Sequence, residues 1–274
     1  MEIIKAILFG IVEGITEWLP VSSTGHMILL DEIIKLDVSE EFYKLFEVVI
    51  QLGAILAVLI IFWKKIWPFY KARGKVRIDK QILSLWGKIL TACLPAAIFG
   101  LLLDDFLDEH LYNGLVVSIA LIVYGIIFII IESKNIGSKS TKSLGDITYK
   151  QAFGVGAFQL LSLIPGTSRS GSTIIGGLIL GLERSVIAEF TFFLAIPVMV
   201  GASLLKLLKY IVKVGLTFTS TEIVVLIVGC IVSFVVSLFV IKFLLNYIRK
   251  HDFKIFGYYR IILGIIVLLW FCFR

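Results

Sequence analysis

The sequence predicts an all-α integral membrane protein, with six transmembrane helices and two re-entrant helix–loop–helix hairpins arranged as an inverted-topology repeat. Three observations predict this fold class: an apolar composition, six long and nearly uncharged windows, and two apolar stretches interrupted by proline, glycine and hydroxyl residues. Hydrophobic residues make up 59% of the 274 residues, well above the usual apolar share of a soluble domain.

Six segments are apolar enough to cross a bilayer, which takes roughly 20 residues of helix. The windows LVVSIALIVYGIIFIII (115–131) and IVVLIVGCIVSFVVSLFVI (223–241) contain no charged residue. The first apolar run, residues 6–12, leads into Glu13 rather than a small-residue cleavage site, so it does not resemble a removed signal peptide. The expected spans are residues 42–63, 86–103, 113–131, 187–211, 222–247 and 257–273.

Two further apolar stretches, residues 3–34 and 151–184, are each broken in the middle. Each half is too short to cross a bilayer alone. Irregular backbone at membrane depth is tolerated only where protein covers it or it lines a water-filled cavity. We therefore expect each stretch to form a re-entrant hairpin.

An internal repeat relates the two hairpins. LPVSS at residues 19–23 aligns with IPGTS at residues 164–168, about half the chain later, and three spans lie between them. An odd number of spans inverts the second copy, as in inverted-topology repeats whose broken helices meet near the midplane. This predicts a single transmembrane domain, residues 1–274, with repeats of about 1–131 and 151–274.

Loop charges orient the chain, because cytoplasmic loops carry an excess of Lys and Arg. The loop at 64–85 holds seven basic residues and one acidic residue, whereas the loop at 104–112 holds Asp104, Asp105, Asp108 and Glu109 and no Lys or Arg. The first loop should be inside and the second outside. The loop at 132–150 is lysine-rich and should be inside. The first hairpin then enters from outside and the second from inside. The net charge of +6 reflects this topology, so no nucleic-acid partner is expected.

The first hairpin carries an acidic pair, Glu13 and Glu17, one helical turn apart on one face. Like charges in an apolar setting are costly and need compensation. A divalent cation would supply it, because Mg²⁺ prefers one or two carboxylates plus phosphate oxygens, with Ca²⁺ a second candidate. The alternative is that both carboxylates point into water at a helix end.

Hydroxyls and a histidine follow this acidic pair. Pro20 ends a half-helix, and Ser22, Ser23, Thr24 and His26 stand where the next helix begins. A serine becomes a nucleophile beside a base, and His26 is the histidine nearest to hydroxyls in an apolar stretch. Helix capping by the hydroxyls and a structural histidine are the alternatives.

The second hairpin contains PGTSRSGST, residues 165–173. Arg169 offers a planar fork suited to phosphate, and Thr167, Ser168 and Ser170 offer hydroxyls at a helix N-terminus. The alternative is an arginine that extends to the membrane interface. Together the hairpins supply a metal site, an anion clamp, a nucleophile and a proton carrier, which indicates phosphoryl transfer on a lipid-borne phosphate.

The motifs EGITEWLPVSSTGH (13–26) and PGTSRSGST (165–173) closely resemble the two signatures of the undecaprenyl-pyrophosphate phosphatases of the bacitracin-resistance type. FEVVIQLGAILAV (46–58) and AEFTFFLAIP (188–197) also resemble segments of that family. The resemblance implies an enzyme of the bacterial inner membrane that converts undecaprenyl pyrophosphate to undecaprenyl phosphate. This reaction would recycle the lipid carrier for peptidoglycan.

The resemblance also implies roles for single residues. Glu13 and Glu17 would handle metal and pyrophosphate, Ser23 would be the nucleophile and His26 its acid/base partner. Attack by a water that His26 activates stays open. The remaining hydroxyls and Arg169 would bind substrate: Ser22, Thr24, Thr167, Ser168, Arg169 and Ser170. Trp18 stands where the family often has phenylalanine, a conservative departure.

The competing class of protein is a lipid-phosphate transporter or flippase, because inverted repeats with broken helices are typical of transporters. A carrier needs an anion clamp but no nucleophile, so the serine, histidine and glutamate set favours the enzyme. The sequence does not determine the oligomeric state, and a homodimer is left open.

The predicted topology can be tested with cysteines introduced into a variant that lacks Cys93, Cys230 and Cys272. A cysteine within residues 31–40 should react with an impermeant thiol reagent in intact cells. One within residues 71–77 should react only after lysis. The reverse pattern would contradict the orientation and place the first hairpin on the inner side.

Overall fold

The structure is a computed structural model that describes residues 1–72, 74–111, 113–136 and 140–273, without the side chains at 104–106, 108 and 109. Two basic residues of the predicted loops, Arg73 and Lys139, lie outside the described residues. So do the side chains of the predicted acidic loop: Asp104, Asp105, Asp108 and Glu109.

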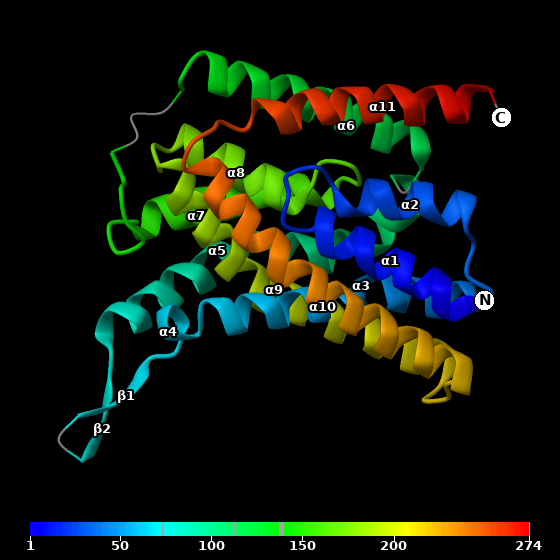
Figure 1. Cartoon of the computed structure of the whole chain (residues 1–274), viewed down its shortest axis with the longest axis horizontal. Helices are drawn as coiled ribbons and strands as arrows, with labels where there is room; N and C mark the ends of the chain where they lie inside the picture. Colours follow the sequence, from blue (N-terminus) through cyan, green and yellow to red (C-terminus); the bar gives the residue numbers. More distant parts are fainter. Residues whose placement is uncertain (73, 112, 137–139, 274) are drawn as a thin grey trace.

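Within the described residues, six helices are long and apolar enough to cross a membrane, and the all-α membrane fold class is confirmed. They run between the two ends of the molecule, and both chain termini lie at the same end (Figure 1). These helices are α3 (Glu40–Ile61), α5 (Lys80–His110), α6 (Gly114–Ser133), α9 (Arg184–Val214), α10 (Ser220–Ile248) and α11 (Lys254–Phe273).

Two predicted loops contain more regular structure than expected. The segment 64–85 includes the short helix α4 (Trp63–Ile66) and a β-hairpin of β1 (Phe69–Ala72) and β2 (Lys75–Ile78). The β-hairpin is followed by Asp79, whose carboxylate accepts hydrogen bonds from the N–H groups of Gln81 and Ile82 and caps α5. The prediction of a loop at 104–112 is wrong in part, because α5 continues as a helix to His110.

The two interrupted stretches fold as helix–loop–helix hairpins that start from opposite ends of the molecule and meet at their loops (Figure 1). Their placement as re-entrant segments of a bilayer stays a prediction. The first hairpin consists of α1 (Glu2–Thr16) and α2 (Ser23–Ile33). The second consists of α7 (Tyr149–Gln159), the 3₁₀ turn η1 (Leu160–Leu163) and α8 (Arg169–Ile179).

The helix contacts are those expected if each helix of the first repeat has a counterpart at the same place in the second. Helix α1 packs on α10 as α7 packs on α5, while α3 contacts α9 and α6 contacts α11. Glycines allow these backbones to approach closely: a β-carbon at Gly10 would lie 2.8 Å from the Gly229 oxygen, and one at Gly156 would lie 2.2 Å from the Ala92 oxygen. The bounds of the two repeats stay a prediction.

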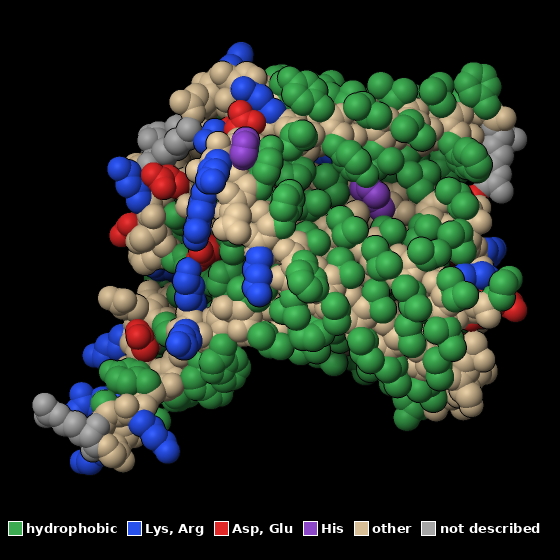
Figure 2. All heavy atoms as spheres, in the orientation of Figure 1, with side chains coloured by type: hydrophobic (Ala, Val, Ile, Leu, Met, Phe, Trp, Pro, Cys, Tyr) green, Lys and Arg blue, Asp and Glu red, His purple; other side chains and the backbone are tan. Residues whose placement is uncertain are grey.

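The surface agrees with a membrane location. Figure 2 shows hydrophobic side chains over the flank of the helices, with most visible Lys and Arg side chains at the end that carries the β-hairpin. Large hydrophobic side chains of the spanning helices are exposed, among them Leu102, Phe239 and Ile262. Apolar surface of this extent on helices of spanning length suits contact with lipid tails.

The packing of α3 on α10 predicts an asymmetric response to alanine at two glycines. A β-carbon at Gly53 would lie 2.2 Å from the Cys230 carbonyl oxygen, whereas one at Gly201 would meet no atom within 4 Å. Gly53→Ala should destabilise the protein by roughly 1–3 kcal/mol, because one helix must shift. Gly201→Ala, in the spanning helix α9, is the matched control. Equal thermal unfolding midpoints of the two variants in detergent would contradict this packing.

Candidate active site

The Glu17 carboxylate joins the two hairpin loops. One oxygen accepts a hydrogen bond from Ser23 Oγ at 2.7 Å, and the other accepts one from Arg169 Nη2 at 2.9 Å. The Glu17 side chain is 5% exposed and that of Arg169 is 10% exposed. A carboxylate, a hydroxyl and a guanidinium therefore lie together in a largely buried environment, where charge–charge interactions are stronger than at an exposed surface.

Both loops place a serine with the same positive φ at the start of a half-helix. Ser22 and Ser168 each have φ of 73°, and the side chain of each accepts the N–H of the glycine three residues later, Gly25 or Gly171. This equivalence corrects the alignment of LPVSS with IPGTS by one position. The letters of the motifs match best with Ser23 opposite Ser168, but the capping geometry pairs Ser22 with Ser168.

Three of the predicted hydroxyls hold the second loop in place. Ser170 Oγ lies 3.3 Å from the Glu17 and Leu19 carbonyl oxygens and 3.1 Å from Ser168 Oγ. Thr167 Oγ1 lies 2.8 Å from the Leu161 carbonyl oxygen and 2.7 Å from that of Ile164, within its own loop. Ser170 therefore contacts the first hairpin, whereas Thr167 and Ser168 form their hydrogen bonds within the second loop.

Arg169 is anchored on two sides. Besides the bond to Glu17, Nη1 donates to the Thr191 carbonyl oxygen of α9 at 2.9 Å. Its buried Nε has no partner within the described part of the chain. The guanidinium is thus held in a fixed direction, and its Nε–H donor is unpaired within the described residues.

A second arginine, Arg260 of α11, ties the loops together and was missed by the sequence reasoning. It is fully buried, and it donates to the carbonyl oxygens of Pro20 at 3.1 Å, Gly166 at 2.7 Å and Thr167 at 3.0 Å. Its guanidinium also lies 5.5 Å from the centre of the Tyr124 ring, within cation–π range. The available signal was an arginine inside an apolar spanning segment, which is functional by default.

Among the described hydrogen bonds, none joins His26 to the Ser23 side chain. Its Nδ1 is 2.7 Å from the Ser22 carbonyl oxygen and its Nε2 is 2.6 Å from the Tyr259 hydroxyl, with the two rings parallel. Among the described hydrogen bonds, that of the Ser23 hydroxyl goes to Glu17 instead. The predicted acid/base role of His26 toward Ser23 would require a change in this arrangement, and it stays a prediction.

Two buried side chains near the loops lack partners for some of their polar atoms. Glu13 is 1% exposed with one oxygen unpaired, and Gln159 is 1% exposed with both amide atoms unpaired, within the described residues. The structural register that pairs Ser22 with Ser168 also pairs Glu13 with Gln159. An unpaired buried polar atom is costly, so each side chain is a candidate to bind a ligand. The sequence reasoning missed Gln159, which this register would have indicated.

A cavity of about 410 Å³ opens beside the loops. Its polar wall includes Glu17, Ser23, Thr24, Ser168 and Arg169, and its remaining wall is mostly apolar. The apolar part comes from η1, α5 and α9, with small residues on the helices: Ala96, Ala97, Gly100, Gly201 and Ala202. The cavity therefore has one end suited to an anion and walls suited to a hydrocarbon chain.

The residues available for a metal are the acidic pair. The described residues form no cluster of three or more His, Cys, Asp or Glu that could hold an ion. The unpaired Glu13 oxygen and the Glu17 carboxylate are hard oxygen donors, and a bound phosphate would add more. This donor set would suit a divalent cation only if substrate and water supplied the other ligands.

The fold and the cavity define a polytopic membrane protein with a cavity, polar at one end, beside the meeting point of two hairpin loops. The chain belongs to the family described as Bacitracin resistance protein BacA, which it matches over residues 6–266. A protein of Enterococcus faecalis named Undecaprenyl-diphosphatase is 58% identical over 271 residues, covering 98% of this chain and 97% of its own. One of the same name from Desulfitobacterium hafniense is 57% identical over 276 residues, covering 100% of this chain and 98% of its own.

The contacts of Arg260 predict that lysine cannot replace it. An ammonium group lacks the planar fork that reaches carbonyl oxygens of both loops, so at least one buried oxygen loses its donor. We expect Arg260→Lys to lower the free energy of unfolding by about 1–3 kcal/mol. The exposed Arg249→Lys is the control and should unfold like the parent protein in detergent. Parent-like stability of Arg260→Lys would contradict the assigned contacts.

Proposed function

We propose that this chain hydrolyses undecaprenyl diphosphate to undecaprenyl phosphate and inorganic phosphate. The observation that carries the proposal is the Glu17 carboxylate, which holds Ser23 and Arg169 together at the polar wall of the cavity. The names of the relatives support the substrate. Such a reaction recycles a lipid carrier for cell-wall synthesis, and bacitracin resistance agrees with the family description.

Binding of the diphosphate depends on the second loop. The fork of Arg169 and the N-terminus of α8, which begins at Arg169, both favour a phosphate anion. The unpaired amide of Gln159 is the candidate to donate a further hydrogen bond after a change of rotamer. The apolar walls on α5 and α9 then accommodate the first isoprene units of the lipid.

The proposed reaction starts at Ser23, whose hydroxyl already donates to Glu17. As Oγ attacks the terminal phosphorus, Glu17 accepts the hydroxyl proton and the bond to the bridging oxygen breaks, releasing undecaprenyl phosphate. Water then hydrolyses the phosphoserine and releases inorganic phosphate. Direct attack by water is the alternative, and His26 is the residue predicted to activate it.

Glu13 and Glu17 are proposed to hold a divalent cation, Mg²⁺ or Ca²⁺. A bound cation would neutralise charge that develops on the phosphate oxygens. The unpaired oxygen of buried Glu13 supports this assignment.

We propose that the reaction takes place at the outer face of the bacterial cytoplasmic membrane. The first hairpin, which carries Glu17 and Ser23, starts from the end of the molecule where both termini lie (Figure 1). The basic residues gather at the opposite end (Figure 2), which the positive-inside rule places in the cytoplasm.

A phosphatase assay tests the function. Purified protein in detergent or vesicles should release phosphate from a prenyl diphosphate, and Ser23→Ala should lose nearly all of this activity. Protein that releases no phosphate but moves the lipid between leaflets would contradict the proposal and favour the transporter.

Arg169→Lys tests the anion clamp. Lysine keeps the positive charge but loses the fork, and we expect at least about a tenfold fall in kcat/KM, which corresponds to roughly 1.4 kcal/mol. Arg184→Lys is the matched control, because Arg184 also pairs with a glutamate, Glu132, but lies outside the cavity lining. Near-normal turnover of Arg169→Lys would remove it from substrate binding.

The metal proposal predicts that excess chelator abolishes activity and that Mg²⁺ or Ca²⁺ restores it. Glu13→Gln should weaken the apparent affinity for the ion, because one anionic ligand is lost. Isothermal titration of the ion, without substrate, provides a readout that does not depend on turnover. Full activity in excess chelator would exclude the metal from the mechanism.

A further inference from the structure

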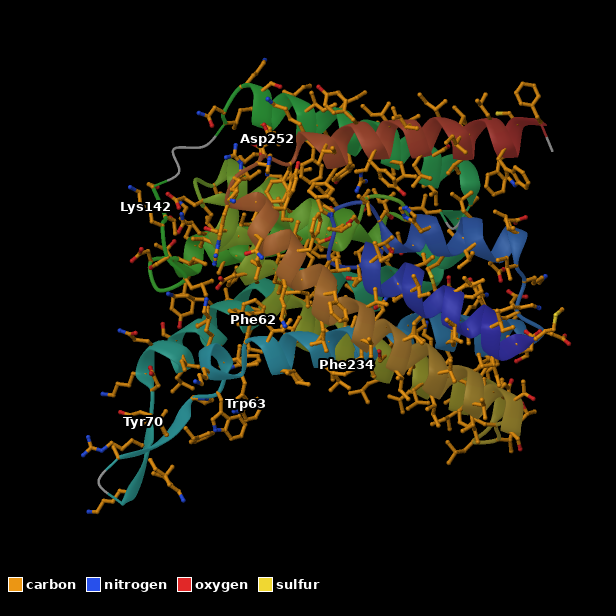
Figure 3. All side chains as sticks on the ribbon, viewed as in Figure 1. Phe62, Trp63, Tyr70, Lys142, Phe234 and Asp252 are labelled. Carbon is orange, nitrogen blue, oxygen red and sulfur yellow. The ribbon has the colours of Figure 1, made fainter. Side chains whose placement is uncertain are left out.

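An exposed aromatic cluster lies where α3 ends. Trp63 and Trp67 stack with ring centres 4.6 Å apart, and the Phe69 ring meets Trp67 edge-on at 5.5 Å. All three side chains are nearly half exposed. Figure 3 shows Trp63 beside the β-hairpin, on the side toward the spanning helices. Tryptophan in this position is typical of a membrane interface, where its apolar ring and polar N–H face different surroundings.

The β-hairpin continues this cluster on one face. Its register pairs Phe69 with Ile78 and Lys71 with Val76, and directly paired residues lie on the same face of a hairpin. Phe69, Ile78 and Val76 therefore form an apolar face, with exposed fractions of 47%, 52% and 66%. An isolated two-stranded hairpin is only marginally stable in water, so an uncovered apolar face needs a partner.

Basic residues lie beside this apolar face and on the opposite face of the hairpin. The opposite face of the hairpin contains Lys75 and Arg77, and Lys71 lies beside Val76. No ion pair is described for these three side chains within the described residues. The acidic residue nearest to them in the sequence is Asp79, whose carboxylate caps the N-terminus of α5. The hairpin projects beyond the bundle at the end where Lys and Arg gather (Figure 2).

We propose that this aromatic and basic hairpin, residues 63–72 and 74–78, binds the headgroup region of an anionic lipid leaflet. Its apolar face, with the aromatic cluster, enters the acyl boundary, and its lysines and arginine contact lipid phosphates. An anionic leaflet satisfies both halves of the surface, because it presents negative charge above a hydrocarbon layer. The hairpin begins at the end of a spanning helix, so it already lies at the depth of the headgroups. This proposal is independent of the proposed catalytic function.

Fluorescent labels on single cysteines can test the depth of each face. Val76→Cys reports the apolar face and Tyr70→Cys the opposite face, each in a chain whose three native cysteines are replaced by alanine. The full chain is placed in nanodiscs of phosphatidylcholine, with or without phosphatidylglycerol, and the label is an environment-sensitive fluorophore. We expect a blue shift at Val76→Cys that requires phosphatidylglycerol, and a much smaller shift at Tyr70→Cys. An increase in salt from about 0.1 M to about 1 M shortens the screening length from about 10 Å to about 3 Å and should reduce the shift.

The charge requirement has a matched control. Combined Lys71→Gln, Lys75→Gln and Arg77→Gln should abolish the blue shift at Val76→Cys. Combined Lys134→Gln, Lys142→Gln and Lys150→Gln removes three charges elsewhere at the same end of the bundle and should preserve it. Unchanged thermal unfolding midpoints in detergent would show that the bundle is intact in both.

Three outcomes would overturn the proposal. The first is a label at Val76→Cys that stays in an aqueous environment with phosphatidylglycerol. The second is an equal shift in phosphatidylcholine alone, or one that persists in the hairpin charge variant. The third is a shift that appears only when cytoplasmic proteins are added, which would identify a protein partner instead.

Discussion

The pairing of Glu17 with Arg169 is the interaction on which the rest of the structure depends. It joins residues 152 positions apart, from hairpins that start at opposite ends of the molecule. A buried carboxylate or guanidinium without its partner is strongly destabilising, so neither hairpin loop can be placed alone. Both must reach the same depth, and that constraint brings Ser23 and the start of α8 to one place.

Broken helices explain why polar groups gather at this depth. A helix that stops halfway leaves N–H and C=O groups without helical partners, and a membrane interior offers little water to satisfy them. Here Ser22 and Ser168 cap the returning helices, while Arg260 satisfies carbonyl oxygens of both loops. One of these capping groups, Ser168, also lines the polar wall of the cavity.

The repeat offers a way to divide chemical roles between two similar backbones. In the register defined by Ser22 and Ser168, Ser23 corresponds to Arg169 and Glu13 to Gln159. One copy thus supplies carboxylates and a hydroxyl, and the other supplies a cation and an amide. Across the two copies, the Glu17 carboxylate of one pairs with the Arg169 guanidinium of the other.

The sequence by itself determined the class of fold and the two loops that matter. Apolar windows of spanning length predict six helices, and proline, glycine and hydroxyls predict the two breaks, because these signals are local. The sequence also singled out Glu17, Ser23 and Arg169 as residue types that suit phosphate chemistry. Their mutual contacts could not be derived, since nothing local relates Glu17 to a residue 152 positions later.

Only the tertiary structure decided which partner each group takes. In the structure the Ser23 hydroxyl donates to Glu17 and the His26 ring bonds with Tyr259, although His26 is the histidine nearest to Ser23 in the sequence. The tertiary structure also brought Arg260 from α11 onto both loops and left Gln159 buried without partners for its amide. The physical reason is that hydrogen bonds and burial depend on how distant helices pack, whereas helix length and chain breaks depend on neighbouring residues alone.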